Sequence, residues 1–428
     1  MNRRRFLLSV YLADMASLFL GIGYGSWVAF GTPLLWSAAI PGGGSPWPFV
    51  ALMAINATVA SWVSVLGWAR TAPRPTYGRA LAIVGLTVGL TAVALAFTRV
   101  YWSRPMFLAA SVAFLALALA HRMIRRRRPW TEPMVVITKE KSLAEELRDA
   151  PHADVLEVFD PSEESPTEPL DAATSLVVDL RAVLSDEMAQ WVSSCSIAGN
   201  TIRALAPVYE EHTGRIPMVH LAEGWELSQP VRRNTYEVFK RPIDIVLVLL
   251  TAPLWMAIAA VIWVTVHLDS PGPALYRQER VGRRGSTFTL YKFRTMVEDA
   301  ELDGPKFATE SDPRLTRVGR VLRKTRMDEV PQLWNTLKGD LSIVGPRPER
   351  PVFVDEYIAK IPFYADRFLI RPGVTGWAQV NYGYADDEAD TIEKLTFDLY
   401  YVKHSSVWLD LNILGKSVWT VLSGFGAR

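Results

Sequence analysis

Residues 245–268 read IVLVLLTAPLWMAIAAVIWVTVHL, a stretch without Asp, Glu, Lys or Arg that is long enough to cross a bilayer. Pro253 lies inside it, and a proline within a helix removes a hydrogen bond and kinks or breaks the helix. Basic residues flank the stretch on both sides, with Lys240 and Arg241 before it and Arg277, Arg280, Arg283 and Arg284 after it. Positive charge on both flanks favours the cytoplasmic side for both ends. We therefore predict a re-entrant helix–break–helix over residues 243–268, with a straight span kinked at Pro253 as the alternative.

The first 128 residues carry four more apolar segments. Half of the 428 residues are hydrophobic, and no Asp, Glu, Lys or Arg occurs from Met15 to Ala69. A turn rich in glycine and proline at residues 40–46 divides that long stretch in two. Because backbone groups in lipid must be paired within the segment, we expect transmembrane helices. Their predicted ranges are residues 6–30, 46–68, 80–98 and 105–120.

The basic residues near these segments set their orientation. They lie before the first span, between the second and third, and after the fourth: Arg3, Arg4 and Arg5; Arg70, Arg74 and Arg79; Arg122 and Arg125 to Arg128. The first hairpin loop has no charge, and the loop after the third span has only Arg99 and Arg104. The pattern predicts that the N-terminus and everything after Arg128 are cytoplasmic. Asp14, inside the first span, is expected near the cytoplasmic interface or packed against another helix.

Residues 129–230 change in character and predict a small α/β domain. Buried strands are expected at residues 135–137, 175–179 and 202–205, and helices at residues 144–148 and 187–195. This alternation is typical of a parallel sheet of a degenerate Rossmann-like kind. Dinucleotide-binding sheets have a glycine-rich turn after the first strand, but residues 138–142 here read TKEKS. We expect an assembly or regulatory domain without a bound dinucleotide.

Few residues outside the C-terminal part suggest a site. Cys195 is the single cysteine, so an internal disulfide is excluded. The six histidines show no metal-ligand spacing. Residues 271–350, in contrast, hold sixteen Lys or Arg residues. Such a basic segment could meet anionic lipid headgroups, nucleic acid or a diphosphate substrate. We do not expect nucleic acid as a partner, because no nucleic-acid-binding module is recognisable.

The adjacent carboxylates Asp328 and Glu329 lie within this basic segment. They are expected at a helix start, with Pro331 in the first turn. Leu333, Trp334 and Leu337 would form the apolar face that follows. A helix N-terminus attracts anions, and carboxylates beside cations stay ionised; the nearby cations are Arg323, Lys324, Arg326 and Arg347. An ionised Asp can attack phosphorus and a second carboxylate can hold Mg²⁺, although the pair alone would favour an N-cap with surface salt bridges.

Five ordered motifs decide between these alternatives. They are QERVG at residues 278–282, YKFRTM at 291–296, MDEVPQL at 327–333, VGPRP at 344–348 and RPGVTGWAQVN at 371–381. From about residue 240 to residue 428 the chain resembles the bacterial sugar transferase family. These are monotopic polyprenyl-phosphate phosphoglycosyl transferases that start exopolysaccharide, capsule and O-antigen repeat units. The four N-terminal spans and the α/β domain look like the large members, and residues 400–428 look like the exopolysaccharide subgroup.

The resemblance implies a mainly α catalytic domain over residues 236–428, with a re-entrant helix broken at Pro253. It implies that Asp328 is the nucleophile and that Glu329 is a Mg²⁺ ligand. Basic phosphate-binding positions fall on Lys292, Arg323 and Arg347, and the motif residues Arg280 and Arg294 are further candidates for substrate binding. Two positions depart from the family: Arg326 stands where many members have Ser, and Leu341 where many have Met.

The function expected from the resemblance is transfer of a sugar-1-phosphate from a nucleotide sugar, with uridine as the expected base, to undecaprenyl phosphate. The expected mechanism is ping-pong, through a phosphosugar on Asp328 and with Mg²⁺ as cofactor. The expected location is the bacterial inner membrane, with the catalytic domain on the cytoplasmic face and in contact with membrane lipids. A homo-oligomer is left open. The alternatives are a glycosyltransferase that releases a nucleoside diphosphate and a non-catalytic scaffold for polysaccharide assembly.

Overall fold

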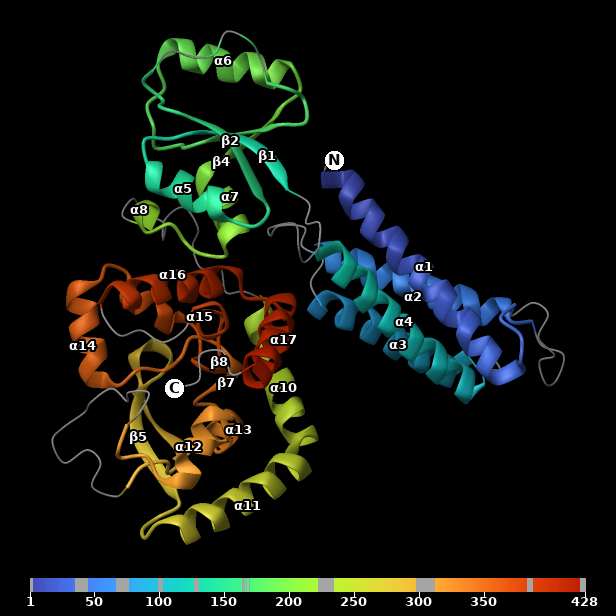
Figure 1. The fold of residues 1–428 in the computed structure, drawn as a ribbon, viewed down its shortest axis with the longest axis vertical. Helices are drawn as coiled ribbons and strands as arrows, with labels where there is room; N and C mark the ends of the chain where they lie inside the picture. Colours follow the sequence, from blue (N-terminus) through green and yellow to red (C-terminus); the bar gives the residue numbers. More distant parts are fainter. Residues whose placement is uncertain are drawn as a thin grey trace. The chain divides into compact units, whose positions relative to one another are not determined.

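The computed structural model describes residues 3–34, 45–66, 77–98, 103–126, 131–163, 166, 168, 170–221, 235–297, 312–382 and 388–423 (Figure 1). The chain divides into two compact units, Met1–Pro217 and Met218–Arg428. The first contains the apolar N-terminal helices and a small sheet, and the second contains all of the C-terminal motifs. Arg128, Arg428 and the loop at residues 40–44 lie outside the described residues.

Four helices form the N-terminal part: α1 Arg3–Phe30, α2 Trp47–Leu66, α3 Tyr77–Thr98 and α4 Arg104–Arg126. Segments of α1, α3 and α4 are long and apolar enough to cross a membrane, and α2 has a shorter apolar segment, Trp47–Val63. The four predicted helices are therefore present. Gly25 lets α1 approach α4 closely, because a Cβ there would lie 2.5 Å from the Met106 carbonyl oxygen.

The one carboxylate of α1, Asp14, is buried against α4. Its two oxygens accept hydrogen bonds from the Arg122 guanidinium at 2.6 and 2.9 Å, and the His121 ring nitrogen Nε2 lies 2.9 Å from Oδ1. A charge in an apolar helix needs such a partner, because an unpaired buried charge is costly. The expectation that Asp14 packs against another helix is confirmed.

The α/β region contains the strands β1 Glu132–Ile137, β2 Ala153–Phe159, β3 Ser175–Val178 and β4 Thr201–Ala204. They form a parallel sheet in the order β2-β1-β3-β4. Helices α5 Lys141–Asp149 and α7 Leu205–Thr213 pack on one face, and α6 Asp186–Ile197 packs on the other. The predicted parallel α/β sheet is confirmed. Strand β2 was not predicted, because this edge strand exposes Asp154, Leu156 and Glu157 and lacks a buried strand's apolar run.

The second unit is mainly helical around short sheets. Its elements are α8 Met218–Leu221, α10 Thr235–Leu250, α11 Ala252–Asp269, β5 Leu275–Val281, η2 Arg283–Gly285, β6 Thr287–Phe293, α12 Arg317–Lys324, η3 Met327–Glu329, α13 Gln332–Lys338, β7 Ser342–Val344, α14 Pro351–Lys360, η4 Tyr364–Leu369, β8 Gly373–Thr375, α15 Trp377–Asn381, α16 Glu388–His404 and α17 Val407–Ser423. Strands β5 and β6 form an antiparallel hairpin, and β7 pairs with β8 in parallel.

The apolar stretch after Arg241 is broken where the sequence predicts it. Helix α10 ends at Leu250, α11 begins at Ala252, and the chain changes direction between them (Figure 1). Pro253 lies in the first turn of α11, where its missing N–H leaves no hydrogen bond unmade. The Trp255 indole nitrogen donates to the Val248 carbonyl across the break at 3.1 Å. The helix–break–helix is confirmed, although α10 begins at Thr235, earlier than the predicted residue 243.

Candidate active site

The carboxylates Asp328 and Glu329 lie together in the single 3-10 turn η3. Arg326 precedes this turn with a left-handed φ of 58°, so the chain reverses direction between α12 and η3. Both carboxylates are only 8% exposed. The expected helix start is therefore corrected in detail: the pair precedes α13 by one turn, and Pro331 is the N-cap of that helix.

Glu329 is held by basic side chains. Its Oε1 lies 2.7 Å from Arg347 Nη2 and 3.2 Å from Lys292 Nζ, and Arg326 Nη1 is 4.0 Å away. Burial, the largest single influence, raises the pKa of Glu329, but the combined charges of these three cations hold that pKa well below its usual range. Glu329 is thus an ionised carboxylate fixed in place.

The neighbouring Asp328 has a different environment. Among the residues that the structure describes, none donates a hydrogen bond to its carboxylate or forms an ion pair with it. Burial raises the pKa of Asp328, Lys292 lowers it, and the like charge of Glu329 raises it again, with a net upward shift. Sequence reasoning expected the cations to favour ionisation of both carboxylates, but for Asp328 desolvation outweighs them.

Three of the predicted phosphate-binding residues surround this pair. Lys292 comes from β6, Arg347 from the loop after β7, and Arg323 from α12. Arg323 donates from Nε to Thr295 Oγ1 at 3.0 Å, and its charge also lowers the pKa of Asp328. Burial lowers the pKa of Lys292, and the charge of Glu329 partly offsets this decrease. The cluster is therefore rich in positive charge around Asp328, whose carboxylate forms no ion pair with a described residue.

The other two predicted binding residues have different neighbours. Arg280 donates to the Pro348 carbonyl at 2.9 Å and lies 3.4 Å from Glu349, so it braces the loop that carries Arg347. Burial lowers the pKa of Arg280 to about 10. Arg294 donates to the carbonyls of Ser270, at 2.7 Å, and of Pro271, at the end of α11. The structure therefore places Arg280 beside the cluster and Arg294 outside it.

Comparison with known proteins identifies the family. Residues 235–424 match the sequence model of the bacterial sugar transferase family. UDP-glucose:undecaprenyl-phosphate glucose-1-phosphate transferase of Caulobacter vibrioides is 40% identical over 198 residues, 45% of this chain and 73% of that protein. The chain belongs to the bacterial sugar transferase family. Its expected membership is confirmed.

Two further relatives are similar to this chain over lengths that differ. UDP-N-acetylgalactosamine-undecaprenyl-phosphate N-acetylgalactosaminephosphotransferase of Aeromonas hydrophila is 42% identical over 255 residues, 59% of this chain and 60% of the relative. UDP-glucose:undecaprenyl-phosphate glucose-1-phosphate transferase of Escherichia coli K12 is 42% identical over 192 residues, 44% of this chain and 40% of the relative. This sugar transferase chain therefore spans less than two thirds of the length of each of these two relatives.

Two supporting residues of the sugar transferase domain were missed from the sequence. Arg367 donates to the Arg347 carbonyl at 2.9 Å and to Asp398 at 2.7 Å. Asn335 accepts from the Tyr291 backbone nitrogen at 3.1 Å and donates to the Thr289 carbonyl at 2.7 Å, which fixes β6 next to Lys292. Neither residue lies in a motif that signals its role, because both act on distant backbone.

The structure also corrects the predicted face of α13. Gln332, Asn335 and Thr336 are its buried side chains, whereas Trp334 is 53% exposed and Leu333 and Leu337 are half-buried. The apolar pattern was misleading because the contact with β6 is made by hydrogen bonds to Asn335 rather than by apolar packing.

The carboxylate pair has donor atoms that suit Mg²⁺. Arg347 and Lys292 both bond to Glu329 Oε1, so Oε2 of Glu329 and both oxygens of Asp328 have no hydrogen bond from a described residue. Carboxylate oxygens completed by substrate phosphates are the ligands that Mg²⁺ takes in such sites. The residues present therefore fit the expected cation.

A second cluster of possible metal ligands lies in the α/β region. Glu132, Glu211 and His212 bring their ligand atoms within 4.8 Å of one another. Arg203 already forms ion pairs with both carboxylates, at 3.3 Å to Glu132 and closer to Glu211. The cluster is therefore an internal ion-pair network of the first unit. The spacing of the histidines in the sequence did not predict this cluster.

Proposed function

We propose that this sugar transferase moves a sugar-1-phosphate from a UDP-sugar to undecaprenyl phosphate, the first step in building an exopolysaccharide or capsule repeat unit. The observation that carries the proposal is a pair of buried carboxylates among Lys292, Arg323 and Arg347. Asp328 has no hydrogen bond or ion pair with a described residue, whereas Glu329 is fixed by Arg347 and Lys292. The names of the relatives from Caulobacter and Aeromonas state this type of transfer for those proteins.

In the first step of the proposed mechanism, an Asp328 oxygen attacks the phosphorus linked to the sugar. A bond forms between that oxygen and phosphorus, and the bond from phosphorus to the bridging oxygen breaks. UMP leaves with the electron pair. Asp328 suits this role because no described side chain occupies its lone pairs. Lys292, Arg323 and Arg347 offset the repulsion between carboxylate and diphosphate.

In the second step, a phosphate oxygen of the carrier attacks the same phosphorus. The bond from phosphorus to Asp328 breaks, which restores the free carboxylate and yields a lipid-linked diphosphate sugar. Glu329 Oε2 would hold Mg²⁺, which would supply charge neutralisation to the diphosphate. The Arg347 and Lys292 bonds keep Glu329 ionised and oriented for that role.

We further propose that α10 and α11 form a re-entrant hairpin in the cytoplasmic leaflet of the bacterial inner membrane, and that α1 to α4 cross that membrane. Support comes from the exposed apolar side chains Val246, Leu250, Leu254, Val261 and Leu268. The end of α11 is also hydrogen-bonded to the segments that contribute residues to the site. Arg294 of the β6 segment bonds the Ser270 carbonyl, and the Val318 nitrogen of α12 donates to Asp269 at 3.0 Å. The hairpin would thereby hold the site at the level of the carrier phosphate.

One experiment separates the proposed reaction from its alternatives. The purified enzyme is given Mg²⁺ and a UDP-sugar labelled in the sugar phosphate, with no carrier. Label should become attached to Asp328, and UMP should be released. Release of UDP would instead show a simple glycosyltransferase. Release of UMP only with carrier, and without labelled protein, would replace the ping-pong scheme by direct transfer. No nucleotide release with any UDP-sugar in the presence of carrier would favour the scaffold.

A further inference from the structure

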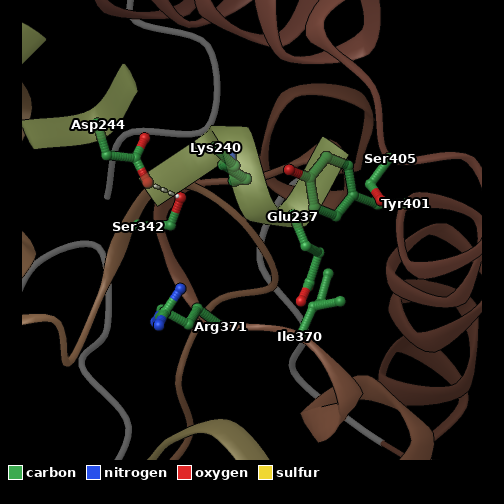
Figure 2. Close-up of a pocket in the computed structure, with 8 residues that line it drawn as sticks. All are labelled: Glu237, Lys240, Asp244, Ser342, Ile370, Arg371, Tyr401 and Ser405. Carbon is green, nitrogen blue, oxygen red and sulfur yellow. Dashed lines mark hydrogen bonds between the residues drawn. The ribbon is translucent and has the colours of Figure 1, made fainter. Parts of the chain in front are cut away.

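A polar pocket lies at the first turns of α10, and it shares no residue with the carboxylate pair and its cations (Figure 2). Glu237, Lys240 and Asp244 line it from α10, Tyr401 from α16, and Arg371 from the segment that precedes β8. Residues one turn apart on a helix share a face, so the three α10 side chains point to the same side. The pocket is thus built from α10 and the body of the domain.

Most charged groups in and around this pocket have partners. Glu237 is paired with Arg283 at 2.6 Å, and Lys240 is paired with Asp410, which also accepts from Tyr401 at 2.7 Å. Asp244 accepts from the Ser342 hydroxyl at 2.7 Å, which Figure 2 shows as a dashed line. These bonds fix the walls of the pocket.

Arg371 is the exception. Its half-buried guanidinium forms no hydrogen bond or ion pair with any residue in the described part of the chain. Burial lowers its pKa, and the charges of Arg283 and Arg241 lower it further. Within the described residues, Arg241 bonds only to backbone carbonyls, of Thr336 and, at 2.8 Å, of Leu337. Among the described residues, these two guanidinium groups therefore lack a carboxylate partner, and a bound anion would offset their mutual repulsion.

The charged groups in and around the pocket have a net charge of one positive unit, as a count of the named residues shows. The cations Lys240, Arg241, Arg283 and Arg371 outnumber the carboxylates Glu237, Asp244 and Asp410 by one. A ligand with a single negative charge would neutralise the site. A phosphodiester carries one such charge and offers oxygens to the planar donors of arginine.

The position of the pocket along α10 indicates where such a ligand would come from. On the same turn of α10, Val238 is 69% exposed and Phe239 is 61% exposed. Phe239 and Lys240 are adjacent, so they differ by about 1.5 Å along the helix axis. With α10 inserted as proposed above, these exposed apolar side chains would enter lipid at the level of the pocket, and the pocket would lie among phospholipid headgroups.

We propose that this pocket binds the phosphodiester of an anionic glycerophospholipid, with Arg371 as its main ligand. The proposal rests on the proposed membrane insertion of α10 and α11. It commits to a phospholipid rather than the carrier, because the carrier phosphate must reach Asp328. A bound lipid would fix the entry angle of α10 and, through it, the height of the domain at the membrane.

The test uses the full chain, delipidated in neutral detergent. Phosphatidylglycerol, phosphatidylethanolamine, phosphatidylcholine and undecaprenyl phosphate are added separately, and the bound lipid is counted by native mass spectrometry. Phosphatidylglycerol should bind with one saturable site, and Arg371→Gln should weaken it by about tenfold or more, as expected for loss of a charge-assisted hydrogen bond. Arg371→Lys should lose less. The matched control is Arg284→Gln, which removes an exposed arginine next to Arg283 and should leave binding unchanged.

Three results would overturn the proposal. An equal loss in Arg284→Gln would show diffuse attraction to a basic surface. Equal binding of the zwitterionic lipids would remove the argument from charge. Binding of undecaprenyl phosphate in preference to phosphatidylglycerol would make the pocket a carrier site. Flotation with liposomes tests membrane insertion separately. A chain that does not float with the liposomes refutes the proposed insertion of α10 and α11. The binding measurement in detergent tests the role of Arg371 independently of that result.

Discussion

Arg347 Nη2 lies 2.7 Å from Glu329 Oε1, while the carboxylate of the adjacent residue Asp328 receives no hydrogen bond from any described residue. Two neighbouring carboxylates in one 3-10 turn thus have opposite environments, and their pKa values shift in opposite directions. Such a separation assigns different roles to chemically similar groups. Glu329 suits a fixed anchor for a cation, and Asp328 suits a nucleophile.

The first prediction concerns Asp328→Asn. The amide keeps the shape of the side chain but removes the charged nucleophile, so turnover should fall by several orders of magnitude. Protein-bound label in the carrier-free reaction should disappear, and the thermal unfolding midpoint should stay close to that of the parent. The control is Asp355→Asn, which changes an exposed carboxylate on α14 and should leave turnover unchanged. Substantial labelling of the Asp328→Asn protein would exclude this residue as the nucleophile.

The second prediction concerns pH. Attack requires ionised Asp328, and burial raises the pKa of that carboxyl above its usual value, so the rate of the first half-reaction should fall as pH falls through this raised pKa. Lys292 is the cation that lowers the pKa of Asp328 most. Lys292→Met should therefore move the acid limb of the residual rate to higher pH.

The matched control for this pH measurement is Lys338→Met, because Lys338 is a partly exposed lysine that pairs with Asp340. Its acid limb should coincide with that of the parent enzyme. A limb that moves to lower pH in Lys292→Met, or does not move, would contradict the assignment of the limb to Asp328.

The sequence revealed the elements whose signal is local. Long apolar runs predicted α1 to α4. Pro253, inside an apolar stretch with basic residues on both sides, predicted the break between α10 and α11. The family resemblance predicted Lys292, Arg323 and Arg347 as phosphate-binding residues, and these residues lie around Asp328 and Glu329. What the sequence did not reveal depends on distant partners. Arg367 and Asn335 form hydrogen bonds with backbone that lies at least twenty residues away in the sequence. The residues next to them in the sequence do not predict these bonds.

The third prediction tests the membrane topology. Glu279 and Lys139 are exposed residues that lie after α11 and after α4, respectively. Cysteines engineered at either position should resist a membrane-impermeant thiol reagent in intact spheroplasts and react after permeabilisation, if both regions are cytoplasmic. The single native Cys195 is buried and should contribute little background. Leu34→Cys, in the first hairpin loop, is the control that should react from outside. Labelling of Glu279→Cys but not of Lys139→Cys in intact spheroplasts would establish a straight span.

The fourth prediction concerns the packing that positions Arg323. A Cβ on Gly319 would lie 2.0 Å from the Thr295 carbonyl oxygen, which is backbone and cannot swing aside. Gly319→Ala should therefore push α12 away from Thr295 and carry Arg323, which bonds Thr295 Oγ1, away from Asp328. Overpacking of this kind costs about 1–3 kcal/mol of unfolding free energy, and a displacement near 1 Å can cost roughly 100-fold in rate. Thermal unfolding and turnover measure the two effects.

Gly415→Ala separates this steric effect from a general effect of replacing glycine in a helix. Gly415 lies inside α17, and a Cβ there meets no atom within 4 Å. Alanine loses less backbone entropy than glycine in a helix, so this change should leave turnover intact and stabilise the fold by about 0.5–1 kcal/mol. Arg323→Gln in the parent then shows how much of the rate loss in Gly319→Ala follows from the displaced guanidinium. If Gly319→Ala lowers stability but not turnover while Arg323→Gln lowers turnover, the position of Arg323 does not depend on its contact with Thr295. If Arg323→Gln itself leaves turnover unchanged, the proposed role of Arg323 beside Asp328 would have to be abandoned.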